Sequence, residues 1–131
     1  MTMPHERTRS LRWGFEFLSE MLLDEMIEAS TRATARRLLL TYPRPNSILE
    51  LIEADAPGLP QTEIEALVEA SALWGRLQVS GVGSQGTRHT LKFVQRHFPE
   101  PLLSRMLGRD PAGGVRRWLL PEDYEYERDG S

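Results

Sequence analysis

Apolar residues recur at helical spacing near the start of the chain. The stripe consists of Leu11, Phe15, Leu18 and Leu22. Side chains with this spacing lie on one face of a helix. We therefore predict a long amphipathic helix over about residues 5–26.

Prolines and capping residues divide the following stretch into shorter helices. Pro43 ends the second helix, because proline has no amide hydrogen and its ring clashes with the preceding turn. Thr62, followed three residues later by Glu65, has the pattern of a capping box and predicts the start of a fourth helix. The further helices are predicted over about residues 31–42, 45–52, 61–74 and 102–107, with a docking segment over 115–120.

The segment 77–94 allows two interpretations. As in a β-hairpin, apolar positions alternate on both sides of the glycine-rich turn 81–86, through Leu77, Val79, His89, Leu91 and Phe93. The spacing of Leu91, Val94 and Phe98 instead fits a helix after the turn. We favour the helix and keep a short hairpin near 77–94 as the alternative.

Length and composition indicate one globular domain. The chain has 131 residues, of which 40% are hydrophobic and 27% charged, a balance that allows a buried core. We predict an all-α fold, a small single-domain bundle of about five to six helices. The domain is expected over residues 1–120, and residues 121–131 are expected to be an acidic, mobile tail.

Two stretches of the chain echo each other. The segment 31–45 reads TRATARRLLLTYPRP and the segment 87–101 reads TRHTLKFVQRHFPEP. They align without a gap at Thr, Arg, Thr, an aromatic residue and Pro-x-Pro. The match favours two pseudo-repeated units, while an aromatic residue that closes a helix ahead of proline is also common punctuation. Both interpretations remain open.

The first 45 residues carry a family resemblance. The opening MTMPHERTRSLRWGFEFL and the later ARRLLLTYP resemble short, uncharacterised bacterial proteins that open with a Met-Pro-x-Glu-Arg-Thr-Arg box and have a helix ending like Leu-Leu-Arg-His-Tyr-Pro. The RHFP at 96–99 looks like a second version of this ending. The resemblance implies a helical fold and a bacterial source, and no activity. This chain departs from the pattern at Thr41, where the family has His, and in its extension beyond Pro60.

The residue types that carry catalysis or bind metals form no recognisable motif. With no cysteine, thiolate metal sites and cysteine nucleophiles are excluded. His89 and His97 lie more than about 10 Å apart on a straight helix, too far to hold one ion together. The glycines of the turn 81–86 lack the Lys-Ser or Lys-Thr partner of a phosphate-binding loop. We expect no catalytic site, no metal and no cofactor.

Hydropathy and cysteine usage bear on the compartment. The amino terminus is polar, and no apolar run approaches the roughly 20 residues that span a bilayer. The absence of cysteine suits a reducing environment. We expect a cytoplasmic protein that does not bind membranes.

Charge is unevenly distributed along a chain whose net charge is -3. Basic residues dominate 87–119, and acidic residues dominate 51–86 and the tail. Tryptophan and arginine most often dominate interface energetics. The candidate partner-binding residues are Trp13, Glu63, Glu65, Glu69, Arg88, Lys92, Arg96, Arg116, Arg117 and Trp118.

These features favour a non-enzymatic protein that binds another protein. One version is an acidic inhibitor or immunity-type protein, for example phage-encoded, acting on a nucleic-acid-processing partner, because acidic faces compete with phosphate for a basic surface. The alternative is a DNA-binding transcriptional regulator with a degenerate winged helix, whose wing would span 77–94. Nucleic acid ranks second as a partner, and the sequence leaves the oligomeric state open.

Overall fold

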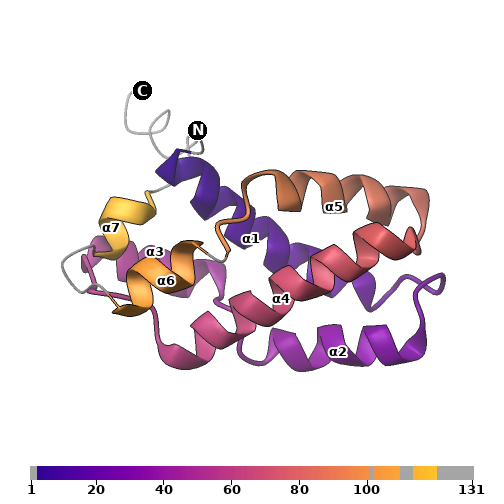
Figure 1. Ribbon diagram of the computed structural model, residues 1–131. Helices are drawn as coiled ribbons and strands as arrows, with labels where there is room; N and C mark the ends of the chain where they lie inside the picture. The colour runs from indigo at the N-terminus through magenta and orange to yellow at the C-terminus, as the bar shows by residue number, and fades with distance from the viewer. Residues whose placement is uncertain (1–2, 101, 110–113, 121–131) are drawn as a thin grey trace.

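The protein is a bundle of helices (Figure 1). The computed structural model describes residues 3–100, 102–109 and 114–120. Over these residues the predicted all-α fold is confirmed, with helices and no strand. The helices are α1 (Pro4–Met21), α2 (Ala29–Leu39), α3 (Pro45–Glu53), α4 (Gln61–Ser80), α5 (Gln85–His97), α6 (Leu102–Arg109) and the single turn α7 (Val115–Trp118). The predicted acidic tail over 121–131 lies outside the described residues.

Helix α1 is the centre of the bundle and contacts α2, α3, α5 and α7. Its predicted apolar stripe is buried through Leu11 and Leu18, together with Phe17. The buried ring of Trp74, from α4, packs edge-on against Phe17 with ring centroids 5.1 Å apart. Burial of this apolar surface from several helices is the main stabilisation of the fold.

Helix α1 is shorter than the sequence predicted, because it ends at Met21 rather than near residue 26. The reason is a tertiary contact at Asp24. Its carboxylate accepts hydrogen bonds from the backbone amides of Met26, at 2.9 Å, and Ser84, at 2.8 Å. These bonds hold a turn that links the end of α1 to the start of α5.

The hairpin considered for 77–94 does not form. Helix α4 continues past the predicted end near Trp74 to Ser80, and Gly81 then ends it in the left-handed conformation, with φ of 66°. Leu77 is buried and Val79 is 90% exposed, so the two belong to different faces of a helix. On α5 the buried residues are Thr87, Leu91 and Val94, whose spacing is helical.

The two echoing stretches both pack along α1, as α2 and α5 (Figure 1). Their aligned aromatic residues, Tyr42 and Phe98, approach the same point. A Cβ atom added to Gly14 would meet the hydroxyl of Tyr42 and lie 3.3 Å from Cε1 of Phe98. Each stretch therefore places an aromatic ring beside Gly14 on the central helix. The duplication itself stays a prediction.

Candidate functional site

Helices α1 and α5 run side by side in opposite directions. Ser10 Oγ on α1 donates a hydrogen bond of 2.6 Å to the carbonyl oxygen of Val94 on α5. Nearer the start of α1, the Glu6 carboxylate lies 3.1 Å from Nε2 of His97 at the end of α5. These contacts fix the register of the two helices and thereby the side chains on their outer surfaces.

An aromatic pair joins α1 and α5 at the surface of the protein. The rings of Trp13 and Phe93 meet edge-on, with centroids 6.1 Å apart and an interplanar angle of 86°. Phe93 is 46% exposed and Trp13 is half-buried. His89 packs edge-on against Phe93 at 5.0 Å, and the guanidinium of Arg9 lies 5.9 Å from the Trp13 ring centroid. Aromatic residues and arginine are therefore concentrated at one accessible point.

Two hollows flank this pair, and together they form what we call the α1–α5 groove. The hollow of about 190 Å³ is bordered by Arg9, Arg96 and His97, with Glu6 also in its wall. The hollow of about 390 Å³ is bordered by Glu16 and Glu20 from α1 and by Thr90 from α5. The groove thus has a mainly basic end and an acidic end, separated by aromatic rings.

Three of the predicted residues form a basic stripe along α5. Arg88, Lys92 and Arg96 are exposed and recur at every fourth position. The segment 85–97 holds no acidic residue, so nothing within α5 neutralises the stripe. Arg96 also borders the groove. The structure therefore brings Trp13 together with Arg96, the last residue of the stripe.

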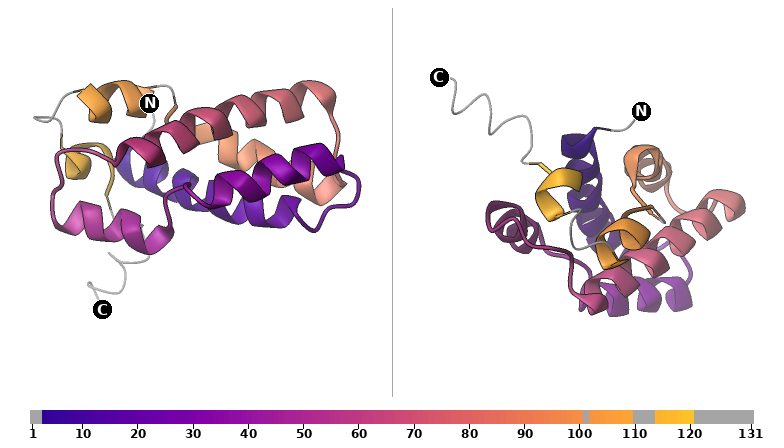
Figure 2. Two further views of the ribbon diagram at one scale, coloured as in Figure 1. Left: turned by 90° about the horizontal axis from the view of Figure 1, so that it is seen from below. Right: turned by 60° about the vertical axis from the view of Figure 1, so that its left-hand side comes forward.

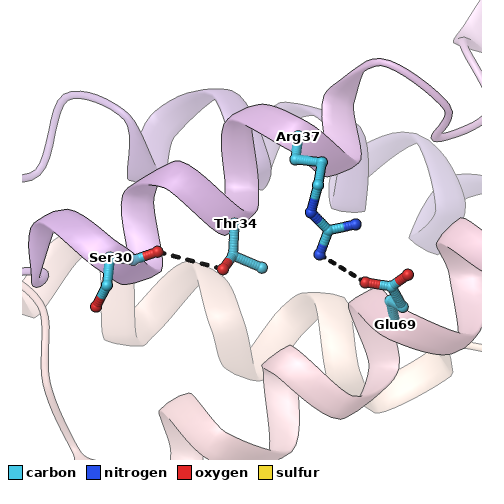
Figure 3. Close-up of polar contacts among 4 residues, drawn as sticks. All are labelled: Ser30, Thr34, Arg37 and Glu69. Atoms are coloured by element: carbon cyan, nitrogen blue, oxygen red, sulfur yellow. Dashed lines mark hydrogen bonds and ion pairs between the residues drawn. The ribbon is translucent and has the colours of Figure 1, made fainter.

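The predicted acidic residues of α4 do not form a single patch. Glu69 accepts a hydrogen bond of 2.8 Å from the guanidinium of Arg37 on α2 (Figure 3), and this contact lowers the pKa of the Glu69 carboxyl. Glu63 is half-buried, and burial raises the pKa of its carboxyl. Glu65 is exposed. One carboxylate is thus paired within the fold and a second is partly withdrawn from solvent.

Glu65 and Glu69 border a second hollow, between α4 and α6. Its volume is about 530 Å³, and Ile64, Val68 and Arg105 also contribute to its wall. Among the described residues its wall holds no aromatic ring, whereas Trp13 and Phe93 line the α1–α5 groove. We therefore rank it below the α1–α5 groove.

The predicted residues of α7 lie away from the groove. Arg116 and Arg117 are exposed, whereas Trp118 is half-buried. Arg7 of α1 donates a hydrogen bond of 2.9 Å from Nε to the carbonyl oxygen of Trp118, and its guanidinium lies 5.3 Å from the Trp118 ring centroid. Figure 2 shows α7 and α5 on opposite sides of α1. Trp118 therefore anchors the end of the domain.

The glycine-rich turn before α5 does not present an open anion site. The Asp24 carboxylate already occupies this turn, because it accepts a hydrogen bond from the backbone amide of Ser84, the N-cap of α5. Hydrogen bonding from the Thr87 side chain and from Ser84 lowers the pKa of Asp24 to about 2. A fixed negative charge thus stabilises the positive end of the α5 dipole, and this occupation argues against a phosphate there.

The part of the chain that the structure describes has neither a metal-binding cluster nor a membrane-spanning helix. No group of three or more His, Asp or Glu side chains could hold a metal ion. No helix in the same residues is long and apolar enough to cross a membrane.

Sequence reasoning identified only part of the groove. The sequence indicates Trp13 and Arg96 as separate candidates, whereas Phe93 enters only as a hairpin or helix position and Arg9 is not among the candidates. Both belong to the groove. A helical wheel of α5 could have found Phe93, because it falls outside the Leu91 and Val94 face and is still large and apolar.

Scans of protein-family models, curated proteins and solved structures each gave no match. The geometry and chemistry of the groove are therefore the observations from which a function can be inferred.

Proposed function

We propose that this protein is a non-enzymatic binding module and that it recognises another protein through the α1–α5 groove. The observation that carries the proposal is the accessible Trp13–Phe93 pair, in which Phe93 is exposed and Trp13 is half-buried, with Arg9 and Arg96 beside it. Tryptophan and arginine are enriched among the residues that dominate binding energy, and such residues cluster at the centre of interfaces. The pair also lies on two helices held in register by Ser10, so the surface is formed before a partner arrives.

The finer version, an acidic inhibitor of a nucleic-acid-processing partner, has less support than the groove. It draws on the carboxylates of α4, of which Glu69 is engaged with Arg37 and Glu63 is half-buried. Glu65 supports it, as does the acidic composition of 121–131. Among the described residues, the clearest surface of one charge is the basic stripe of Arg88, Lys92 and Arg96 on α5.

Site-specific crosslinking tests the protein-binding proposal. The photoreactive residue p-benzoylphenylalanine replaces Phe93 in the full chain, which is expressed and irradiated in its native host. We expect a discrete crosslinked protein, because Phe93 is at the centre of the proposed interface. Leu40 is the matched control position, since it is 78% exposed and lies outside the groove.

Charge reversal makes this test specific. The variant Lys92→Glu, Arg96→Glu in the Phe93-labelled chain should abolish the crosslink, because like charges then face the partner. The variant Arg116→Glu, Arg117→Glu has the same change in charge on α7 and should retain it. The proposal fails if Phe93 and Leu40 give the same products, or if both charge reversals act alike.

The α5 stripe favours DNA binding as a second candidate function. Three cations on one helix, with no acidic residue over 85–97, provide contacts for phosphates. The wing expected over 77–94 does not form as a hairpin in the described residues, since this segment holds the end of α4 and most of α5. A DNA-binding version would instead use the outer surface of α5.

Fluorescence anisotropy with a labelled duplex tests the second candidate. Binding at about 50 mM salt that weakens steeply by about 200 mM would indicate phosphate contacts. Such binding should be lost in Arg88→Glu, Lys92→Glu, Arg96→Glu and kept in Arg116→Glu, Arg117→Glu. No binding at low salt would remove DNA as a partner.

A further inference from the structure

The α1–α5 groove has an ordered pattern of charge that selects its occupant. Arg9 and Arg96 border one end, where the Glu6 carboxylate lies 3.1 Å from His97 Nε2, and Glu16 and Glu20 border the other end. Nucleic acid is a poor match for the whole groove, because a regular series of phosphates would also meet the two carboxylates. A peptide fits better, since it can place carboxylates, aromatic rings and a cation separately along its length.

The carboxyl-terminal segment of this same chain has that chemistry. Residues 121–131 read PEDYEYERDGS. Two tyrosines alternate with carboxylates, and Arg128 follows. The carboxylates match the basic end of the groove, and tyrosine rings are suited to the edges of Trp13 and Phe93. Arg128 supplies the positive charge that the acidic end requires.

The chain is long enough for this contact within one molecule. The backbone amide of Leu120 donates a hydrogen bond of 3.1 Å to Thr8 Oγ1, so the chain reaches residue 121 beside α1. Trp13 lies five residues further along α1, about 7.5 Å along the axis. A path around half of a helix of this diameter is on the order of 17 Å. Residues 121–131 span up to about 36 Å when extended.

We propose that the segment 121–131 binds in the α1–α5 groove of its own chain and covers the Trp13–Phe93 pair. This inference rests on the proposed function, because it assigns an internal competitor to the same binding surface. A tethered segment has a high effective concentration, of order millimolar for a short linker. A partner must therefore displace the segment, and the protein binds only partners that outcompete it.

A spin label at the end of the chain tests the proposal in the full-length protein. The chain has no cysteine, so Ser131→Cys gives one attachment point for a nitroxide. Broadening of nuclear magnetic resonance signals in the ¹⁵N-labelled protein reports which residues lie near it. We expect selective broadening of the Trp13 indole and the Phe93 amide, with the amides of Leu40 and Gly75 unaffected. Raising the salt from about 50 to about 500 mM should weaken the effect.

Charge-matched variants separate docking from proximity. Lys92→Glu, Arg96→Glu in the labelled chain should abolish the broadening at Trp13. Arg116→Glu, Arg117→Glu lies nearer to the start of the segment, has the same change in charge and should leave the broadening intact. Equal effects of both variants, or no selective broadening at Trp13, would overturn the proposal.

A mixing experiment decides between one molecule and two. Spin-labelled protein without ¹⁵N is added to ¹⁵N-labelled protein without a spin label. Docking within one chain predicts no broadening in this mixture, and broadening at Trp13 would assign the occupant to a second copy and overturn the intramolecular proposal. The spin-label experiments contain no partner protein. If they fail, the proposed binding of a partner at Phe93 is still tested separately by crosslinking.

Discussion

The phenol of Tyr42 packs against Gly14 of α1, so that a Cβ atom at Gly14 would collide with the Tyr42 hydroxyl. In this position the hydroxyl donates a hydrogen bond of 2.7 Å to the carbonyl oxygen of Leu11. Close approach of α1 and the end of α2 therefore depends on a residue without a side chain.

Gly14→Ala should destabilise the protein by about 1–3 kcal/mol, because overpacking a buried site outweighs the helix propensity that alanine adds. Gly75→Ala is the matched control, since a Cβ there meets nothing within 4 Å. The control should raise the free energy of unfolding by up to about 1 kcal/mol. Urea denaturation measures both, and equal signs for the two variants would contradict the packing of Tyr42 on Gly14.

Tyr42→Phe should cost about 1 kcal/mol, since it removes a buried hydrogen bond to Leu11. It also removes the hydroxyl nearest to a Cβ at Gly14. The double variant should therefore be more stable than the sum of the two single effects predicts, by about 0.5 kcal/mol or more. Additive effects in a double-mutant cycle would show that the hydroxyl is not the limiting contact.

Asp24→Ala should destabilise the protein by about 2 kcal/mol at pH 7, because it removes charge-assisted hydrogen bonds at the start of α5. The pKa of Asp24 is lowered to about 2, below an unfolded value near 3.9. Its contribution is therefore fully present above about pH 4 and is lost as the pH falls through about 2.

The difference in unfolding free energy between the wild type and Asp24→Ala should accordingly shrink between pH 4 and pH 2. Glu25→Ala, a neighbouring exposed carboxylate, is the control. A difference that stays constant over this range would show that the Asp24 charge does not stabilise the turn.

Glu63→Gln should stabilise the protein at pH 7 by up to about 1 kcal/mol, because one buried carboxylate oxygen of Glu63 has no hydrogen-bond partner. Burial raises the pKa of this carboxyl, so the folded state holds its proton more tightly than the unfolded state. The gain should disappear at low pH, where wild-type Glu63 is protonated in both states. Thermal unfolding at several pH values measures this, with exposed Glu65→Gln as the control. A gain that persists at low pH would exclude the charge as its cause.

Local signals in the sequence predicted the elements well where several of them agreed. Pro99 follows directly after the C-cap of α5, as expected, and the apolar stripe of α1 is buried around Leu11 and Leu18. Helix α2, by contrast, ends at Leu39, short of the predicted end before Pro43. The predicted helix boundaries were wrong where a contact with a residue far away in the sequence determines the end of the helix. Helix α1 ends early because Asp24 bonds to Ser84, sixty residues away in the sequence. No periodicity within the first helix contains that information.

The candidate surface shows the same division. Sequence alone identified Trp13 and the three cations of α5 as residues suited to binding, because residue type and helical spacing are local properties. Only the packing of α1 on α5 placed Trp13 beside Phe93 and Arg96, and only the approach of α2 paired Glu69 with Arg37. The sequence by itself determined that the chain is helical, and which residues carry charge and aromatic surface. The tertiary structure decided which of them share a surface, because that depends on contacts between residues far apart in the chain.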